Sequence, residues 1–143
     1  MKTVRMQQKE LTDAATLAQK LWPDAPALKE EFSASLADAD FAVFLAYEET
    51  VPVGFAQCQL RYDYVEGCST SPVGYLEGIF VEPASRGRGT AKVLLDCCED
   101  WARAQGCTEF ASDCELSNDR SIAFHKSMGF AEENRIVCFK KEL

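Results

Sequence analysis

One segment near the middle of the sequence, Gly74 to Ser112, constrains the fold more than any other. It opens with an apolar run, Gly74 to Val81, and closes with a short strand-like run, Thr108 to Ser112. Between them, apolar residues recur at helical spacing from Gly89 to Gln105, and Gly106 is a residue type that ends helices. A strand, a helix and a strand in this order predict two parallel strands joined by a right-handed crossover.

The rest of the chain adds antiparallel strands and further helices. Phe41 to Tyr47 and Val53 to Tyr62 are strand-like runs on either side of a turn at residues 48–50, which predicts a hairpin. The other expected strands are Thr3–Gln7 and Ile136–Lys141, and the other expected helices are one capped by Thr12 or Asp13 that runs to Leu21, then Ala27–Ala37 and Asn118–Met128. The sequence therefore predicts an α/β (α+β) fold with a mixed central sheet flanked by helices.

Length and charge narrow the class of protein. The chain has 143 residues, and we expect residues 1–143 to form a single domain. A formal net charge of −8 argues against a nucleic-acid partner, because phosphate binding requires clustered Lys and Arg. The same charge is compatible with a cationic substrate, although surplus carboxylates can equally serve solubility alone. No stretch has the length and apolarity of a membrane span, and we expect neither a membrane partner nor a signal peptide.

The cysteines argue against a metal site. There are seven of them, none at Cys-x-x-Cys spacing, and the single histidine, His125, is far from any of them in the sequence. Most lie in apolar stretches, where a thiol behaves as a small core residue. A chain rich in free thiols fits the reducing cytoplasm, and we expect it to be located there.

The turn at residues 86–91 is the first candidate site. It reads Arg-Gly-Arg-Gly-Thr-Ala and connects the run that ends at Val81 to a predicted helix. A helix N-terminus presents unpaired N–H groups and partial positive charge, and glycine lets the backbone approach a phosphate closely. These features suit a diphosphate, although the turn alone could equally be a solvent-exposed connection. It matches neither the P-loop nor the dinucleotide fingerprint, which disfavours a nucleotide triphosphatase or a dehydrogenase.

The turn resembles the pyrophosphate signature of the GNAT N-acetyltransferase superfamily, with Arg86, Gly89 and Ala91 at the signature positions. A second motif of the family, the helix that follows its fifth strand, is matched by Asn118, Ser121, Phe124, Gly129 and Phe130. The resemblance implies that acetyl-CoA is the co-substrate, with no metal, and that the central sheet is splayed between its two parallel strands. The residues implied in binding acetyl-CoA are Ile79, Phe80, Val81, Arg86, Gly87, Arg88, Gly89, Thr90, Ala91, Lys92 and Asn118.

The resemblance also implies where the thioester lies. A bulge in the strand near Ile79 is expected to open a V-shaped gap toward the strand at Thr108 to Ser112. The pantetheine arm is expected to pair with the backbone of Ile79 to Val81. An N–H near Ile79 would then polarise the acetyl carbonyl, as an oxyanion hole does.

Within the superfamily, the sequence is most similar to the aminoglycoside 6′-N-acetyltransferases. Four segments carry this similarity: Leu21–Pro23, Tyr62–Cys68 with Ser71–Pro72, Leu76–Val81 and Ala111–Asp113. The similarity implies an acceptor that is a cationic small-molecule amine, an aminoglycoside antibiotic acetylated at its 6′-amine in antibiotic resistance. It also implies direct attack in a ternary complex and a homodimer.

Three residues are the catalytic candidates. Glu77 lies in an apolar strand, where a carboxylate is costly unless it is paired or faces a cleft, and it is the candidate general base. Asp113 ends the neighbouring strand, so that both acids would face one gap, although either acid could instead be a solvated edge residue. His125 stands where many relatives have a tyrosine proposed to protonate the leaving thiolate, and it is either that acid or a bystander.

Further residues are candidates for binding the acceptor. Trp22 and Tyr64 have faces that could pack on sugar rings, although Trp22 could equally be a core residue at a helix end. Asn134 stands near a position where the family has an acid, and this departure puts one ammonium contact in doubt. Carboxylates at Glu77 and Asp113 would pair with ammonium groups through charge-assisted hydrogen bonds.

Two other functions remain open. The first is acetylation of a polyamine or a protein amine, since these substrates are also cationic. The second is a regulatory module that binds acetyl-CoA without chemistry, which the presence of both Glu77 and Asp113 disfavours.

Overall fold

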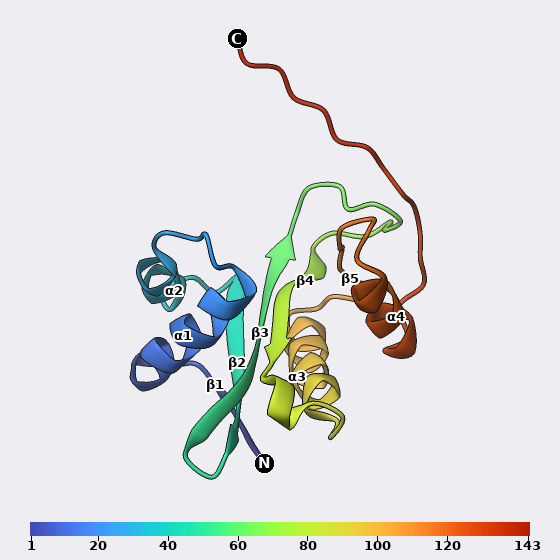
Figure 1. The fold of residues 1–143 in the computed structure, drawn as a ribbon. Helices are drawn as coiled ribbons and strands as arrows, with labels where there is room; N and C mark the ends of the chain where they lie inside the picture. The colour runs from blue at the N-terminus through green and yellow to red at the C-terminus, as the bar shows by residue number, and fades with distance from the viewer.

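The computed structural model describes residues 1–143 and has one five-stranded sheet with helices on both faces (Figure 1). The strands are β1 (Lys2–Arg5), β2 (Phe41–Glu48), β3 (Val51–Arg61), β4 (Val73–Val81) and β5 (Phe110–Ala111), and they lie in chain order across the sheet. The α-helices are α1 (Leu11–Leu21), α2 (Leu28–Ser35), α3 (Thr90–Ala104) and α4 (Asp119–Ser127). Apart from the last strand, the predicted elements are present, with ends that differ by a few residues.

The sheet is mixed, as predicted. The first four strands pair antiparallel, and β4 and β5 pair parallel across the α3 crossover. That parallel pairing involves only Gly74 with Phe110 and Tyr75 with Ala111. From Leu76 to Val81, the edge of β4 that faces β5 has no strand partner, so the predicted splay between the two parallel strands is confirmed.

A bulge interrupts β4 at Glu77. On β3, Gln57 pairs with Gly78 and the next residue, Cys58, pairs with Leu76, so Glu77 is an extra residue without a partner. A bulge bends its strand and re-aims the local side chains. The expected bulge is therefore present two residues before Ile79, and it falls on the candidate base.

Two apolar layers hold the helices to the sheet. On one face, α1 and α2 pack through residues such as Leu17 and Phe32 against Phe55 of β3. On the other, α3 packs through Leu94 and Cys98. Burying a Leu or Phe side chain fully contributes about 1.5–3 kcal/mol, so these contacts fix α3 and its N-terminus relative to β4.

The prediction of a strand at Ile136–Lys141 is wrong. Residues 131–143 form neither helix nor strand, and the end of this segment extends away from the sheet (Figure 1). Val137 and Phe139 are 75% and 90% exposed. β-branched and aromatic residues favour a strand only where a neighbouring strand supplies hydrogen bonds and packing. Residues 136–139 are apolar enough for a strand, but no strand of the sheet pairs with them.

Candidate active site

The turn between β4 and α3 has the geometry of an anion site. Gly87 and Gly89 have φ of +78° and +81°, and a side chain carbon at either position would meet no atom within 4 Å. The backbone N–H groups of residues 87–92 donate no hydrogen bond within the chain. These donors lie at the start of a helix of 15 residues that has no side-chain cap, so they are available to an anion such as a diphosphate.

The side chains of the turn are mostly engaged elsewhere. Arg86 Nε donates to the carbonyl of Val81 at 2.8 Å, which ties the turn to the end of β4. Arg88 lies 3.4 Å from a carboxylate oxygen of Glu48, and Lys92 lies 2.9 Å from Asp96. Both pairs are largely exposed to solvent, where an ion pair contributes little. The backbone N–H groups are therefore the main anion-binding feature, and Arg86, Arg88 and Lys92 add positive charge around them.

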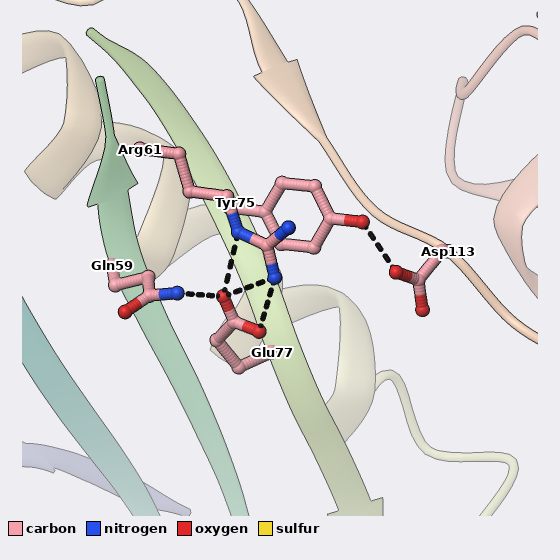
Figure 2. A network of polar contacts seen from close by, with 5 residues as sticks. All are labelled: Gln59, Arg61, Tyr75, Glu77 and Asp113. Carbon is pink, nitrogen blue, oxygen red and sulfur yellow. Dashed lines mark hydrogen bonds and ion pairs between the residues drawn. The ribbon is translucent and has the colours of Figure 1, made fainter. Parts of the chain in front are cut away.

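Glu77 is held by a fork of hydrogen bonds (Figure 2). Arg61 Nη2 donates to Oε1 at 2.9 Å and to Oε2 at 3.0 Å, and Arg61 Nε donates to Oε2 at 3.2 Å. The amide of Gln59 also donates to Oε2. A carboxylate has about four acceptor positions, two on each oxygen. Oε2 is fully engaged, whereas Oε1 has one acceptor position open.

Asp113 belongs to the same network through Tyr75. The Tyr75 hydroxyl donates to Asp113 Oδ2, and the Arg61 guanidinium carbon lies 3.5 Å from the centre of the Tyr75 ring (Figure 2). Burial, followed by the hydrogen bond to Asp113, raises the pKa of Tyr75 well above its usual value. Burial acts to lower the pKa of Arg61, but the hydrogen bond and charge of Glu77 outweigh it and raise that pKa. Tyr75 is therefore a proton donor to Asp113, and Arg61 is a permanent cation between the two acids.

A cleft of about 850 Å³ opens beside this network. Its lining includes Arg61, Tyr64, Tyr75, Asp113 and His125. Asn134 also lines it, and its amide donates to Glu66 Oε1 at 2.6 Å. Tyr64 is 76% exposed on the loop that forms one wall. The cleft thus brings together most of the predicted acceptor-binding side chains.

Of the predicted catalytic and acceptor-binding residues, two lie outside the lining of this cleft. Glu77 is behind Arg61, and its side chain is 20% exposed. Trp22 packs its edge against Phe55, with ring centres 5.9 Å apart, and it lies so close to Gly78 that a side chain carbon there would be 2.5 Å away. Trp22 therefore makes core contacts, as its alternative interpretation proposed, directly beside the bulge.

His125 has a defined pattern of hydrogen bonds. Its Nδ1 lies 2.7 Å from the carbonyl oxygen of Ser121, and its Nε2 lies 2.7 Å from Ser112 Oγ. A carbonyl oxygen only accepts, so Nδ1 carries the proton and Nε2 of the neutral ring accepts from Ser112. A neutral His125 therefore has no proton to give to the cleft.

Asn118, a predicted acetyl-CoA-binding residue, caps α4. Its side chain accepts from the N–H of Ser121 at 3.1 Å.

Glu109 fixes the loop that carries Tyr64. Its Oε1 accepts from the N–H groups of Ser69 and Thr70 at 3.0 and 2.8 Å, and from the Thr70 hydroxyl. The Thr70 hydroxyl, then the Ser69 N–H, lower the pKa of Glu109. A depressed pKa means that these bonds stabilise the folded protein at neutral pH, and that the stabilisation is lost as the pH falls through the folded-state pKa.

We expect Glu109→Gln to unfold at a lower temperature than the wild type at pH 7, because the amide replaces an ionised acceptor. The difference in unfolding temperature between the two proteins should disappear below about pH 4, where the wild-type carboxyl is itself protonated. Unfolding midpoints measured from pH 3 to pH 8 check this. Glu99→Gln, at a partly exposed position on α3, is the control with no such pH dependence. A difference that is constant across this range contradicts the expectation.

No group of three or more His, Cys, Asp and Glu side chains is arranged to hold a metal ion. All seven cysteines are free, and Cys58, Cys98 and Cys107 are buried. None of the helices has the length and apolarity needed to cross a bilayer.

Sequence reasoning did not identify Gln59, Arg61 and Tyr75 as site residues. A signal was present, because Gln59 and Arg61 are two residues apart on one strand and must share a face. Their pairing with Glu77 depends on the register between β3 and β4, including the bulge. That register is not encoded in a local pattern.

Comparison with known proteins supports the same interpretation. The Acetyltransferase (GNAT) family model matches residues 7–130. An aminoglycoside N(6′)-acetyltransferase type 1 from Stenotrophomonas maltophilia is 46% identical over 135 residues, which covers 92% of this chain and 88% of that protein. One of the same name from Acinetobacter haemolyticus is 42% identical over 134 residues, covering 93% and 92%.

Solved structures agree in fold and in sequence. AAC(6′)-Iy in complex with the bisubstrate analogue CoA-S-monomethyl-acetylneamine is 37% identical, with a TM-score of 0.96 over 99% of this chain and 98% of that chain. The apo structure of AAC(6′)-IG from Acinetobacter haemolyticus is 40% identical, with a TM-score of 0.94 over 100% and 99%. The chain therefore belongs to the GNAT family of acetyltransferases, as its turn and its α4 motif predicted.

Proposed function

We propose that this protein transfers the acetyl group of acetyl-CoA to the 6′-amine of aminoglycosides by direct attack in a ternary complex, and that it thereby confers antibiotic resistance. The observation that carries the proposal is the arrangement along β4. The free N–H groups of residues 87–92 follow one end of its unpaired edge, and the carboxylates of Glu77 and Asp113 lie toward the other. The names of the relatives specify the acceptor.

Acetyl-CoA supplies an acetyl group already activated as a thioester. The N–H groups of residues 87–92 bind its diphosphate, together with Arg86, Arg88 and Lys92. The unpaired edge of β4 at Ile79, Phe80 and Val81 orients the pantetheine arm, and an N–H near Ile79 polarises the acetyl carbonyl. Holding both reactants in register is the main source of rate in such a direct transfer.

Glu77 accepts the proton of the reacting amine through the open acceptor position on Oε1, directly or through a water molecule. Asp113 binds an ammonium group of the acceptor, and Tyr64 packs on a sugar ring. Asn134 offers a neutral contact where an acid would bind an ammonium more strongly. His125 can protonate the leaving thiolate only after it has become an imidazolium, so we assign it a minor role.

An acetyl-transfer panel tests the function. Kanamycin and tobramycin, which carry a 6′-amine, should release thiol from acetyl-CoA, and 6′-hydroxy aminoglycosides should release little. Spermidine and a lysine peptide test the alternative of a polyamine or protein amine, which predicts higher kcat/KM for them than for any aminoglycoside. Turnover of the 6′-hydroxy compounds alone would remove the 6′-amine assignment, and binding of acetyl-CoA without transfer to any amine would support a regulatory module.

We also propose that the protein is a homodimer. The C-terminal residues 131–143 support this, because Val137 and Phe139 are exposed and the outer edge of β5 has no neighbouring strand. A second copy that pairs this segment with its own sheet buries both apolar side chains. Exposed apolar patches of this kind are typical of interaction surfaces.

Two further proposals concern organisation and location. Residues 1–143 form a single domain, supported by the one sheet that all five strands share. The protein acts in the cytoplasm, supported by its seven free cysteines, because thiols persist in a reducing compartment.

A further inference from the structure

We propose that Arg61 is a positioning residue that gives the two acids of the site, Glu77 and Asp113, different roles. It neutralises Glu77 in the free enzyme, so that the ammonium groups of the acceptor bind at Asp113 and Glu77 remains available to accept a proton. The inference rests on the proposed function, because it presupposes that Glu77 is the base.

The Arg61 guanidinium separates Glu77 from the cleft. Arg61 lines the cleft whereas Glu77 does not, and the guanidinium lies between the Glu77 carboxylate and the Tyr75 ring (Figure 2). An ammonium group that enters from the cleft therefore meets Arg61 before it meets Glu77. Asp113 lines the cleft itself, and within the network its only hydrogen-bond donor is the neutral hydroxyl of Tyr75.

The Arg61–Glu77 pair is bidentate. The guanidinium engages both carboxylate oxygens through two nitrogens, Nη2 with Oε1 at 2.9 Å and Nε with Oε2 at 3.2 Å, and the Arg61 side chain is 38% exposed. Planar forks of this kind are stronger than single contacts and fix the orientation of both partners. The Tyr75 ring stacks on the guanidinium, whose central carbon lies 3.5 Å from the ring centre. The fork leaves one acceptor position on Oε1, which orients the proton-accepting lone pair.

Glu77 forms a salt bridge, whereas Asp113 does not. Two carboxylates share one permanent cation, and that cation forms its hydrogen bonds with Glu77. An ammonium group is therefore attracted more strongly to Asp113 than to Glu77. Enzymes assign different roles to two acids by giving them different environments, and here Arg61 creates the difference.

Loss of Arg61 should produce a specific kinetic signature. With Arg61→Gln, both carboxylates attract ammonium groups, so KM for a polycationic acceptor should fall about twofold to fivefold. The reacting amine then keeps its proton in a salt bridge with Glu77, so kcat should fall about tenfold, a part of the usual effect of a general base. KM should also become more sensitive to salt than in the wild type.

The experiment is steady-state kinetics with kanamycin and acetyl-CoA at two salt concentrations, alongside thermal unfolding of each variant. Arg61→Lys restores the cation and should return KM to the wild-type value and kcat to within about threefold of it. If Arg61→Gln does not fold, Arg61→Met keeps an aliphatic side chain over Tyr75 and should give the same two shifts.

The outcomes separate this inference from the proposed function. If the wild type does not acetylate kanamycin, the proposed function fails. If the wild type is active but loss of Arg61 raises KM and lowers kcat together, Arg61 only maintains structure and the inference is overturned. Unchanged kinetics overturn it as well. A fall in both KM and kcat, reversed by Lys, supports it.

Discussion

Glu77→Gln should lower kcat/KM for an aminoglycoside by about 10²- to 10⁴-fold, the range typical of a lost general base. The substitution keeps the size of the side chain and one oxygen that can accept from Arg61. It removes the negative charge that makes the side chain a proton acceptor. The bulge fixes Glu77 at the edge where β4 separates from β5, so no neighbouring carboxylate can take its place without movement of the backbone. Steady-state kinetics with kanamycin measures the effect.

Two controls make that result specific. Glu66→Gln is the same chemical change at an acid that lines the cleft beside the network, and it should cost far less because Glu66 only pairs with Asn134. His125→Ala should keep more activity than Glu77→Ala, because the neutral ring is a hydrogen-bond acceptor at Nε2. The reverse order of the two alanine variants would contradict the ranking and make His125 the principal proton-transfer group.

The strand–helix–strand unit around α3 could be predicted from sequence because its information is local. The apolar run to Val81, the glycines of the turn and the period of α3 each act over a few residues. The conformation of the turn follows from the same residues, since Gly87 and Gly89 both have positive φ. The N–H groups of the turn are free because Gly89, at the N-cap of α3, has no side chain that could accept from them.

The polar network could be predicted only in part. The cost of burying a carboxylate in an apolar strand correctly indicated that Glu77 needs a partner or a cleft. Its identity could not be inferred, because Arg61 is 16 residues away and reaches Glu77 only through the register set by the bulge. The same holds for Tyr75 and Asp113, which meet because β4 and β5 are parallel neighbours.

The C-terminal segment marks a different limit. Residues 136–141 have the composition of a strand, but a strand exists only with a partner that donates and accepts its hydrogen bonds. Composition therefore predicts that this segment is able to pair, and the single chain does not supply the pairing.

Gly89→Asp should weaken the binding of acetyl-CoA strongly, raising its Kd about a hundredfold or more, without loss of stability. Asp tolerates positive φ better than most residues, and a carboxylate at the start of α3 caps the helix and complements its dipole. The same carboxylate occupies N–H groups that would bind the diphosphate. At a distance of a few ångströms its charge also repels the diphosphate by several kcal/mol, at an effective dielectric constant of about 20. The Kd for acetyl-CoA should therefore rise while the unfolding midpoint stays the same or rises.

Gly106→Asp is the matched control. Gly106 also has positive φ, at +91°, and a side chain carbon there also meets nothing within 4 Å, but it follows the other end of α3. Its substitution introduces the same backbone strain and the same charge, in a less favourable field at the C-terminus of the helix. Calorimetric titration with acetyl-CoA should give wild-type affinity for Gly106→Asp, although its unfolding midpoint should be the lower of the two. Equal affinities for both variants would mean that the diphosphate is bound elsewhere, because only the location of the carboxylate distinguishes them.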